Sequence, residues 1–96
     1  MSLNNLNKYS DFKTVNNKAL QLYNRSVFIS TRKDKKYMIM NDSKKFIHFG
    51  QLGYEDYTKH LDENRRRLYL TRATKIKGNW KSDKFSPNNL SIHLLW

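Results

Sequence analysis

Residues 48–73, "HFGQLGYEDYTKHLDENRRRLYLTRA", decide how this chain folds and where its charges lie. The segment completes a short apolar strand, turns through "GQLG" and continues into a basic helix. The two glycines of that turn predict the point where the backbone leaves a sheet, because glycine adopts conformations that other residues avoid. We predict a helix from residue 62 to about residue 74, with Asp62 and Glu63 at its positive end and arginines toward its negative end.

The segments on either side of this corner predict a small mixed domain. The apolar side chains of "SDFKTVNNKALQLYN" (residues 10–24) recur at spacings of three and four, which predicts an amphipathic helix with Ser10 or Asp11 as its N-cap. "SVFISTR", "KYMIMN" and "KFIHFG" are short and rich in β-branched or aromatic residues, so they predict strands, and "NDSK" predicts a hairpin turn between the last two. "SPNNLSIHLLW" begins with Ser86 and Pro87, which mark a helix start.

The predicted fold class is therefore α+β, with a three-stranded antiparallel sheet packed against one N-terminal and two C-terminal helices. We expect residues 1–10 to be a flexible N-terminus and residues 11–96 to form a single domain. The chain has no cysteine and no apolar run long enough for a membrane span, so we expect a soluble intracellular protein that does not enter a membrane.

A net charge of +11 is the strongest indication of function. The chain has 19 Lys and Arg against 8 Asp and Glu, and residues 64–81 contain seven bases and no acid. A basic patch of this kind attracts polyanions such as DNA, RNA or an anionic membrane surface. We expect nucleic acid as the partner, and DNA rather than RNA.

The predicted helix divides its basic residues into two groups. Counted at 100° per residue, one sector contains the apolar side chains expected to face the core, namely Leu61, Leu68, Tyr69 and Ile76. Arg65 and Arg72 lie in the same sector, where a charge is costly unless it is paired, so we predict that Glu55 or Asp56 pairs with one of them.

The remaining bases are free for phosphate in this interpretation. The predicted nucleic-acid-binding residues are Arg66, Arg67, Lys75, Lys77 and Lys81, with Lys33, Lys35 and Lys36 as a second patch. No zinc finger, basic zipper or clear helix-turn-helix pattern accompanies them, so the predicted binding is not sequence-specific.

An enzyme is the competing interpretation, because histidines and acids are also concentrated here. The possible metal ligands are His48, Glu55, Asp56, His60, Asp62 and Glu63. Their spacing does not match a helical zinc site, and no G-x-S-x-G elbow surrounds a serine. We therefore expect no catalytic residue, metal, cofactor or small-molecule substrate. A metal-dependent nuclease stays open as a lesser alternative.

The chain also resembles a known group of proteins. The resemblance lies in "HFG…GYEDYT", in the following "RR" and in the closing "LS…LLW", and it covers about two thirds of the chain. These motifs are similar to those of a family of small basic uncharacterised proteins from large nucleocytoplasmic DNA viruses, such as marseillevirus-like and other giant viruses. The resemblance implies a viral protein of the virion or the viral factory, in the host cytoplasm or nucleus, and implies no enzymatic activity.

Together these observations predict a non-specific DNA-binding protein that organises a viral genome. The thin core and the apolar stripe of the N-terminal helix predict a homodimer. The alternative is a protein–protein interaction module or virion component that does not bind nucleic acid.

Overall fold

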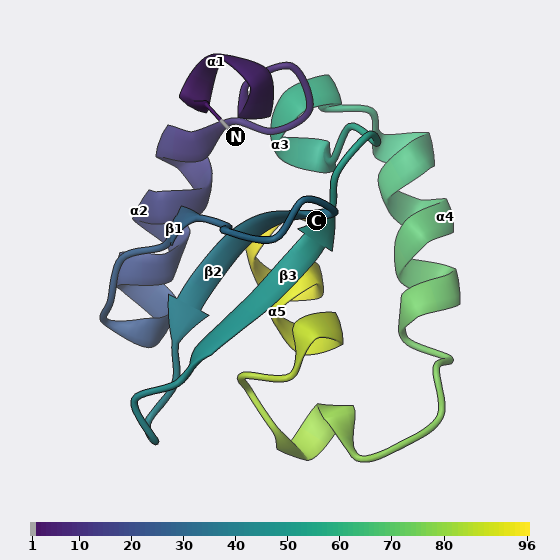
Figure 1. The fold of residues 1–96 in the computed structure, drawn as a ribbon. Helices are drawn as coiled ribbons and strands as arrows, with labels where there is room; N and C mark the ends of the chain where they lie inside the picture. Colours follow the sequence, from purple (N-terminus) through teal and green to yellow (C-terminus); the bar gives the residue numbers. More distant parts are fainter. Residues whose placement is uncertain (1) are drawn as a thin grey trace.

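A three-stranded antiparallel sheet forms the centre of the protein, which a computed structural model describes for residues 2–96 (Figure 1). The strands are β1 (Phe28–Ile29), β2 (Lys35–Met40) and β3 (Phe46–Gln51), in the spatial order β1-β2-β3. Tyr37 of β2 lies opposite Phe49 of β3, and the two rings stack with their centroids 5.7 Å apart. The predicted hairpin and the α+β fold class are confirmed.

Two helices cover one face of this sheet (Figure 1). They are α2 (Phe12–Tyr23) and α5 (Pro87–Leu94). The side chains of the shared core are Leu6, Val15, Ala19, Tyr23, Val27, Tyr37, Ile39, Phe49, Phe85, Leu90, Leu94 and Leu95. Ser86 caps α5 as its sequence predicts, since its hydroxyl accepts a hydrogen bond from the Asn89 backbone N–H.

The opposite face of the sheet carries apolar side chains that remain partly exposed. Phe28 is 50% exposed and Phe46 is 41% exposed, and their rings meet edge to face at 5.9 Å. Both belong to strands whose alternate side chains point into the core, so their outward direction follows from the strand pleat. No helix of the described chain is long and apolar enough to span a bilayer.

The first residues pack against the domain, which differs from the flexible N-terminus expected over residues 1–10. They form α1 (Leu3–Leu6), and the Leu6 side chain is fully buried. The backbone carbonyl of Tyr9 accepts a hydrogen bond from the Asp56 N–H at 3.0 Å. Leu6 therefore packs this segment into the core, and one backbone hydrogen bond joins it to the turn after β3; Met1 lies outside the described residues.

A buried ion pair connects β2 to the turn that follows β3. Lys36 Nζ lies 3.1 Å from Asp56 Oδ2, and both side chains are almost inaccessible to solvent. Burial lowers the pKa of Lys36, and the neighbouring Asp56 carboxylate partly opposes that effect. Asp56, one of the two acids predicted to pair with an arginine, thus pairs with a lysine, and Lys36 is buried where the sequence predicts an exposed basic patch.

Hydrogen bonds extend this pair into the N-terminal half of the chain. The other Asp56 oxygen accepts from the backbone N–H and the hydroxyl of Thr58, and so caps the short helix α3 (Tyr57–His60). Thr58 Oγ1 accepts from the Asp11 N–H at 2.9 Å and lies 3.3 Å from Ser10 Oγ. The Tyr37 hydroxyl donates to Ser10 Oγ at 2.6 Å. The network therefore joins β2, α3 and the start of α2.

Gly50 allows α5 to approach the pair closely. Its φ is +81°, which favours glycine, and a Cβ there would lie 2.9 Å from Leu95 Cδ1 and 3.2 Å from Lys36 Cβ. The glycine of "HFG" thus marks a close approach as well as the predicted turn.

Removing one charge of the buried pair is expected to destabilise the protein strongly. Asp56→Ala leaves Lys36 without its partner, so we expect the free energy of unfolding to fall by about 3–5 kcal/mol. Urea denaturation followed by circular dichroism measures this loss. Glu55→Ala is the matched control, because Glu55 is half-exposed and its removal is expected to cost less than about 1 kcal/mol. Equal losses in the two variants would contradict the structural role given to the pair.

Alkaline pH is expected to destabilise the protein through Tyr37. Burial raises the pKa of Tyr37 above its ordinary value of 10.0, so the unfolded chain releases this proton first. The resulting stability is present below pH 10 and is lost as the pH rises above it. The pKa of Lys36 is lowered and acts in the opposite direction, so Tyr37→Phe isolates the tyrosine. The difference in unfolding free energy between the wild type and Tyr37→Phe should stay constant below pH 9 and decrease toward pH 11. A flat difference across this range would show that the prediction is wrong.

Candidate nucleic-acid interface

The basic helix α4 (Glu63–Ala73) lies beside the sheet and outside the central core (Figure 1). Asp62 is its N-cap, as predicted, and accepts hydrogen bonds from the backbone N–H groups of Asn64 and Arg65. Ala73 is the buried residue of this helix. The backbone carbonyl of Ala73 accepts a hydrogen bond from the Asn88 side chain, which ties the end of α4 to α5.

The apolar sector expected to bury α4 is instead largely exposed. Leu61, Leu68 and Ile76 are 67%, 61% and 53% exposed. Leu61 adopts a left-handed conformation as the C-cap of α3, and Ile76 follows the last residue of α4, so neither belongs to the helix. The leucines of α5 occupy the position against the sheet that this sector was predicted to take.

Arg66 has a structural contact that the sequence did not predict. Its Nε donates to the backbone carbonyl of Trp96 at 2.7 Å, and its guanidinium lies 5.3 Å from the centre of the Tyr57 ring. Glu63 lies 3.8 Å from the same guanidinium. Arg66 therefore links α4 to α3 and to Trp96, and it is less available to phosphate than predicted.

Arg65 and Arg72, which were expected near the core, are exposed. Arg65 Nη1 lies 3.4 Å from Glu55 Oε1, so the predicted pairing of Glu55 with Arg65 is present, but at the surface. A pair with 49% and 41% exposed side chains contributes little to stability, because solvent screens it.

The other predicted binding residues lie at the surface, except for Lys36, which forms the buried pair described above. Arg67, Lys75, Lys77, Lys81 and Lys33 are exposed, Lys35 is partly exposed, and Lys36 is buried. Arg67 donates to Asn64 Oδ1 at 3.2 Å, and Lys81 lies 5.6 Å from the centre of the Trp80 ring. These contacts leave both cations open to solvent.

The residues of α4 line two separate hollows, one on each of two faces of the helix. Its pocket face consists of Arg65, Leu68, Tyr69 and Arg72. Its outer face includes Asn64, Arg67, Thr71 and Thr74, which line a shallow depression. Residues seven apart on a helix share a direction, whereas residues two apart point to nearly opposite sides. Arg65 and Arg72 therefore point away from the direction of Arg67.

Most acids are already engaged by neighbouring groups. Glu55, Asp56, Asp42 and Glu63 form ion pairs, Asp62 caps α4, and Asp83 accepts from the backbone N–H of Phe85. Among residues 2–96, four of the 19 Lys and Arg lie within 4.0 Å of an acid. The positive charge is therefore largely uncompensated at short range.

The candidate metal ligands lie in separate environments. His48 Nδ1 lies 2.7 Å from Ser30 Oγ, and His60 Nδ1 accepts from the Asp62 N–H at 2.9 Å. Burial lowers the pKa of both histidines, and nearby arginines lower it further. Within the described part of the chain, no three His, Cys, Asp or Glu side chains come together as a metal site would require.

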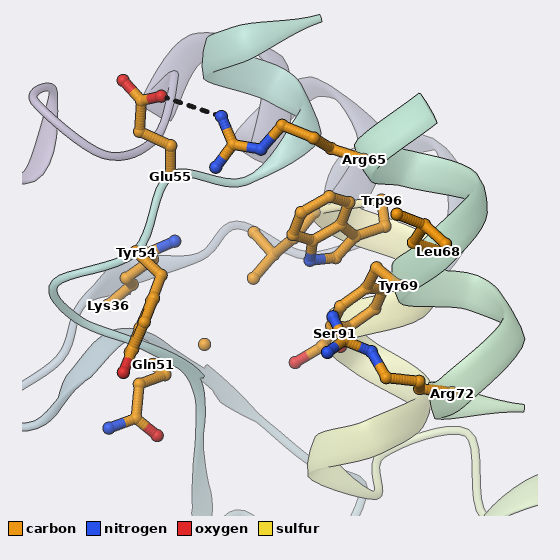
Figure 2. Close-up of a pocket in the computed structure, with 12 residues that line it drawn as sticks. Lys36, Gln51, Tyr54, Glu55, Arg65, Leu68, Tyr69, Arg72, Ser91 and Trp96 are labelled. Carbon is orange, nitrogen blue, oxygen red and sulfur yellow. Dashed lines mark hydrogen bonds and ion pairs between the residues drawn. The ribbon is translucent and has the colours of Figure 1, made fainter. Parts of the chain in front are cut away.

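A pocket of about 400 Å³ lies between the turn after β3, α4 and α5. Figure 2 shows Tyr54 and Gln51 on one side of this pocket and Trp96, Tyr69 and Arg72 on the other. The Tyr69 and Trp96 rings stack, with centroids 4.2 Å apart and planes 10° apart. Burial raises the pKa of the Tyr69 hydroxyl.

Several pocket residues were not singled out by the sequence analysis. Gln51 lies within the predicted turn and Tyr54 follows it, and Ser91 and Trp96 belong to the last predicted helix. The spacing of Arg65, Tyr69 and Arg72 places them in the sector that a helical count predicts to face the core. Whether such a sector faces a core or a cavity depends on the position of α5, which no local pattern specifies.

Residues 26–73 match the model of a family of unknown function (DUF5754). The matched segment contains the whole sheet, the Lys36–Asp56 pair and α4. No curated protein and no solved structure matches this chain.

Proposed function

This chain belongs to the DUF5754 family of unknown function, and we propose that it binds nucleic acid without sequence specificity, with DNA as the preferred partner. The observation that carries the proposal is the exposure of the bases on and after α4. Residues 64–81 contain seven bases and no acid, and Arg67, Lys75, Lys77 and Lys81 are exposed. Each phosphate that such cations neutralise releases counterions, which favours binding to a polyanion.

The position of α4 supports this proposal. The helix has 11 residues and lies beside the domain with one buried residue, so its outer face is open to a large partner. Arg67 lies on that face, and Lys75 and Lys77 follow the end of the helix. Arginine forks onto phosphate oxygens and lysine contacts them as a point charge, so both residue types suit a nucleic-acid backbone.

We further propose that this binding serves the organisation of a viral genome, in the virion or the viral factory. The support is the resemblance of "HFG…GYEDYT" and "LS…LLW" to small basic proteins of large DNA viruses. A domain that contacts phosphates and not bases suits genome compaction, because such a role does not need a preferred sequence.

A protein–protein interaction module is the second candidate. Leu61 and Leu68 are 67% and 61% exposed, and Phe28 and Phe46 are exposed on the open face of the sheet. Exposed apolar side chains of this size mark interaction surfaces when they are contiguous, and a second copy of the chain is one such partner.

Binding to duplex DNA is expected to weaken steeply with salt. Fluorescence anisotropy of a labelled duplex, titrated from about 50 mM salt upward, measures the slope of log affinity against log salt. The triple variant Arg67→Gln, Lys75→Gln, Lys77→Gln should reduce that slope by about 0.9 for each phosphate contact removed. Its matched control changes three exposed lysines elsewhere, Lys8→Gln, Lys13→Gln and Lys44→Gln.

Two results would contradict the proposal. One is the absence of binding at about 50 mM salt, where the counterion contribution is large. The other is an equal loss of slope in the control variant, which would show that net charge alone is responsible. The interaction module would be favoured by two results together. The wild type would not bind DNA, and the protein would still self-associate when Arg67, Lys75 and Lys77 are replaced.

A further inference from the structure

We propose that the pocket between the turn after β3, α4 and α5 binds a single nucleotide, with its phosphate near Arg72 and its base among the aromatic rings. This inference goes beyond the proposed binding of duplex DNA, because the pocket uses the opposite face of α4 from Arg67. The nucleotide is either free in solution or an unstacked unit of a single strand. Both sources present the same chemistry.

The size and lining of the pocket fit a ligand of this class. Its volume of about 400 Å³ lies in the range of small-molecule sites, roughly 300–1,000 Å³. Such sites combine apolar and aromatic walls with a few polar groups. Here Leu68 and Leu95 contribute apolar surface, and Gln51 and Ser91 contribute hydrogen-bonding groups that could contact a base edge.

The charged groups favour an anion. Lys36, Arg65 and Arg72 line the pocket together with one acid, Glu55. Lys36 is already paired with Asp56, so the available cations of the pocket are Arg65 and Arg72. No acid lies within 4.0 Å of the Arg72 guanidinium in the described chain, and Arg65 is held only by its exposed pair with Glu55. Arg72 can therefore bind a phosphate through a forked contact.

The aromatic groups favour a planar ligand over a simple phosphate. Tyr54 is 68% exposed and lies on one side of the pocket, while Trp96 and Tyr69 form a stacked pair on the other (Figure 2). In Figure 2 the indole nitrogen of Trp96 faces the space between these walls, where its N–H can donate to a ligand. Nucleobases stack on exposed aromatic rings whatever their sequence. A nucleotide has a planar base for the aromatic rings and a phosphate for Arg72.

The test is calorimetric titration of the full chain with 2′-deoxyadenosine 5′-monophosphate, at about 50 mM salt so that phosphate contacts are weakly screened. We expect saturable binding at one site. Arg72→Gln should weaken it by at least about tenfold, the loss expected when a charged contact to phosphate is removed. Tyr54→Ala should weaken it as well, and deoxyadenosine and inorganic phosphate should each bind more weakly than the nucleotide.

Arg67→Gln is the matched control, because it makes the same change on the outer face of α4. It should leave nucleotide binding unchanged while lowering duplex affinity, so a failure of this inference can be distinguished from a failure of the proposed function. Both arginines are exposed, and unchanged melting temperatures would show that the variants fold.

A second titration with a short single-stranded oligothymidylate identifies the source of the nucleotide. In one outcome, the oligonucleotide binds in an Arg72-dependent manner while the free nucleotide shows no detectable binding. This result would support the pocket, with a single strand as its ligand. Equal effects of Arg72→Gln and Arg67→Gln, or no binding of either ligand, would overturn the proposal. If a polyglutamate peptide binds through Arg72 and neither the nucleotide nor the oligonucleotide does, the nucleotide proposal is overturned in favour of an acidic protein partner.

Discussion

The buried pair between Lys36 and Asp56 is the constraint on which the rest of the structure depends. Removing a charged lysine and a charged aspartate from solvent costs free energy unless the two are paired and their remaining hydrogen-bonding groups have partners. Here Thr58, Ser10 and Tyr37 continue the hydrogen bonds, so the turn after β3 has one position relative to the sheet. That position sets where α3 begins, and α3 in turn sets where α4 begins. The surface available to a partner is thus determined by a charge pair that is itself buried.

Local patterns in the sequence predicted the elements well. The N-cap at Asp62, the start of α5 at Ser86, the hairpin between β2 and β3 and the α+β class all follow from residues close together in the chain. Each is decided by hydrogen bonds or alternation within a few residues, which a sequence displays directly.

Long-range packing was the part that the sequence did not specify. Lys36 occurs beside Lys33 and Lys35, which predicts a second basic patch, and its burial depends on an acid 20 residues away. Arg66 was predicted to be free because it points away from the supposed core sector, but that direction leads to Trp96. In both cases the partner comes from another element, and a helical count cannot identify it. The sector of α4 that the helical count predicts to face the core lines a pocket instead, because the position of α5 is also set by contacts between distant elements.

The sparse anchoring of α4 has a consequence for its dynamics. A helix that buries one residue and joins the domain through a few hydrogen bonds belongs to the least stable cooperative unit of a protein, so its amide hydrogens should exchange with solvent earlier than those of β2 or α5. A ligand on either face would restrict these openings, and part of its binding free energy would offset the lost conformational entropy. Since both faces belong to the same short helix, a ligand that orders α4 on one side reduces the entropic cost of binding on the other. Duplex and nucleotide would then be coupled through the order of one helix, without any movement of the sheet.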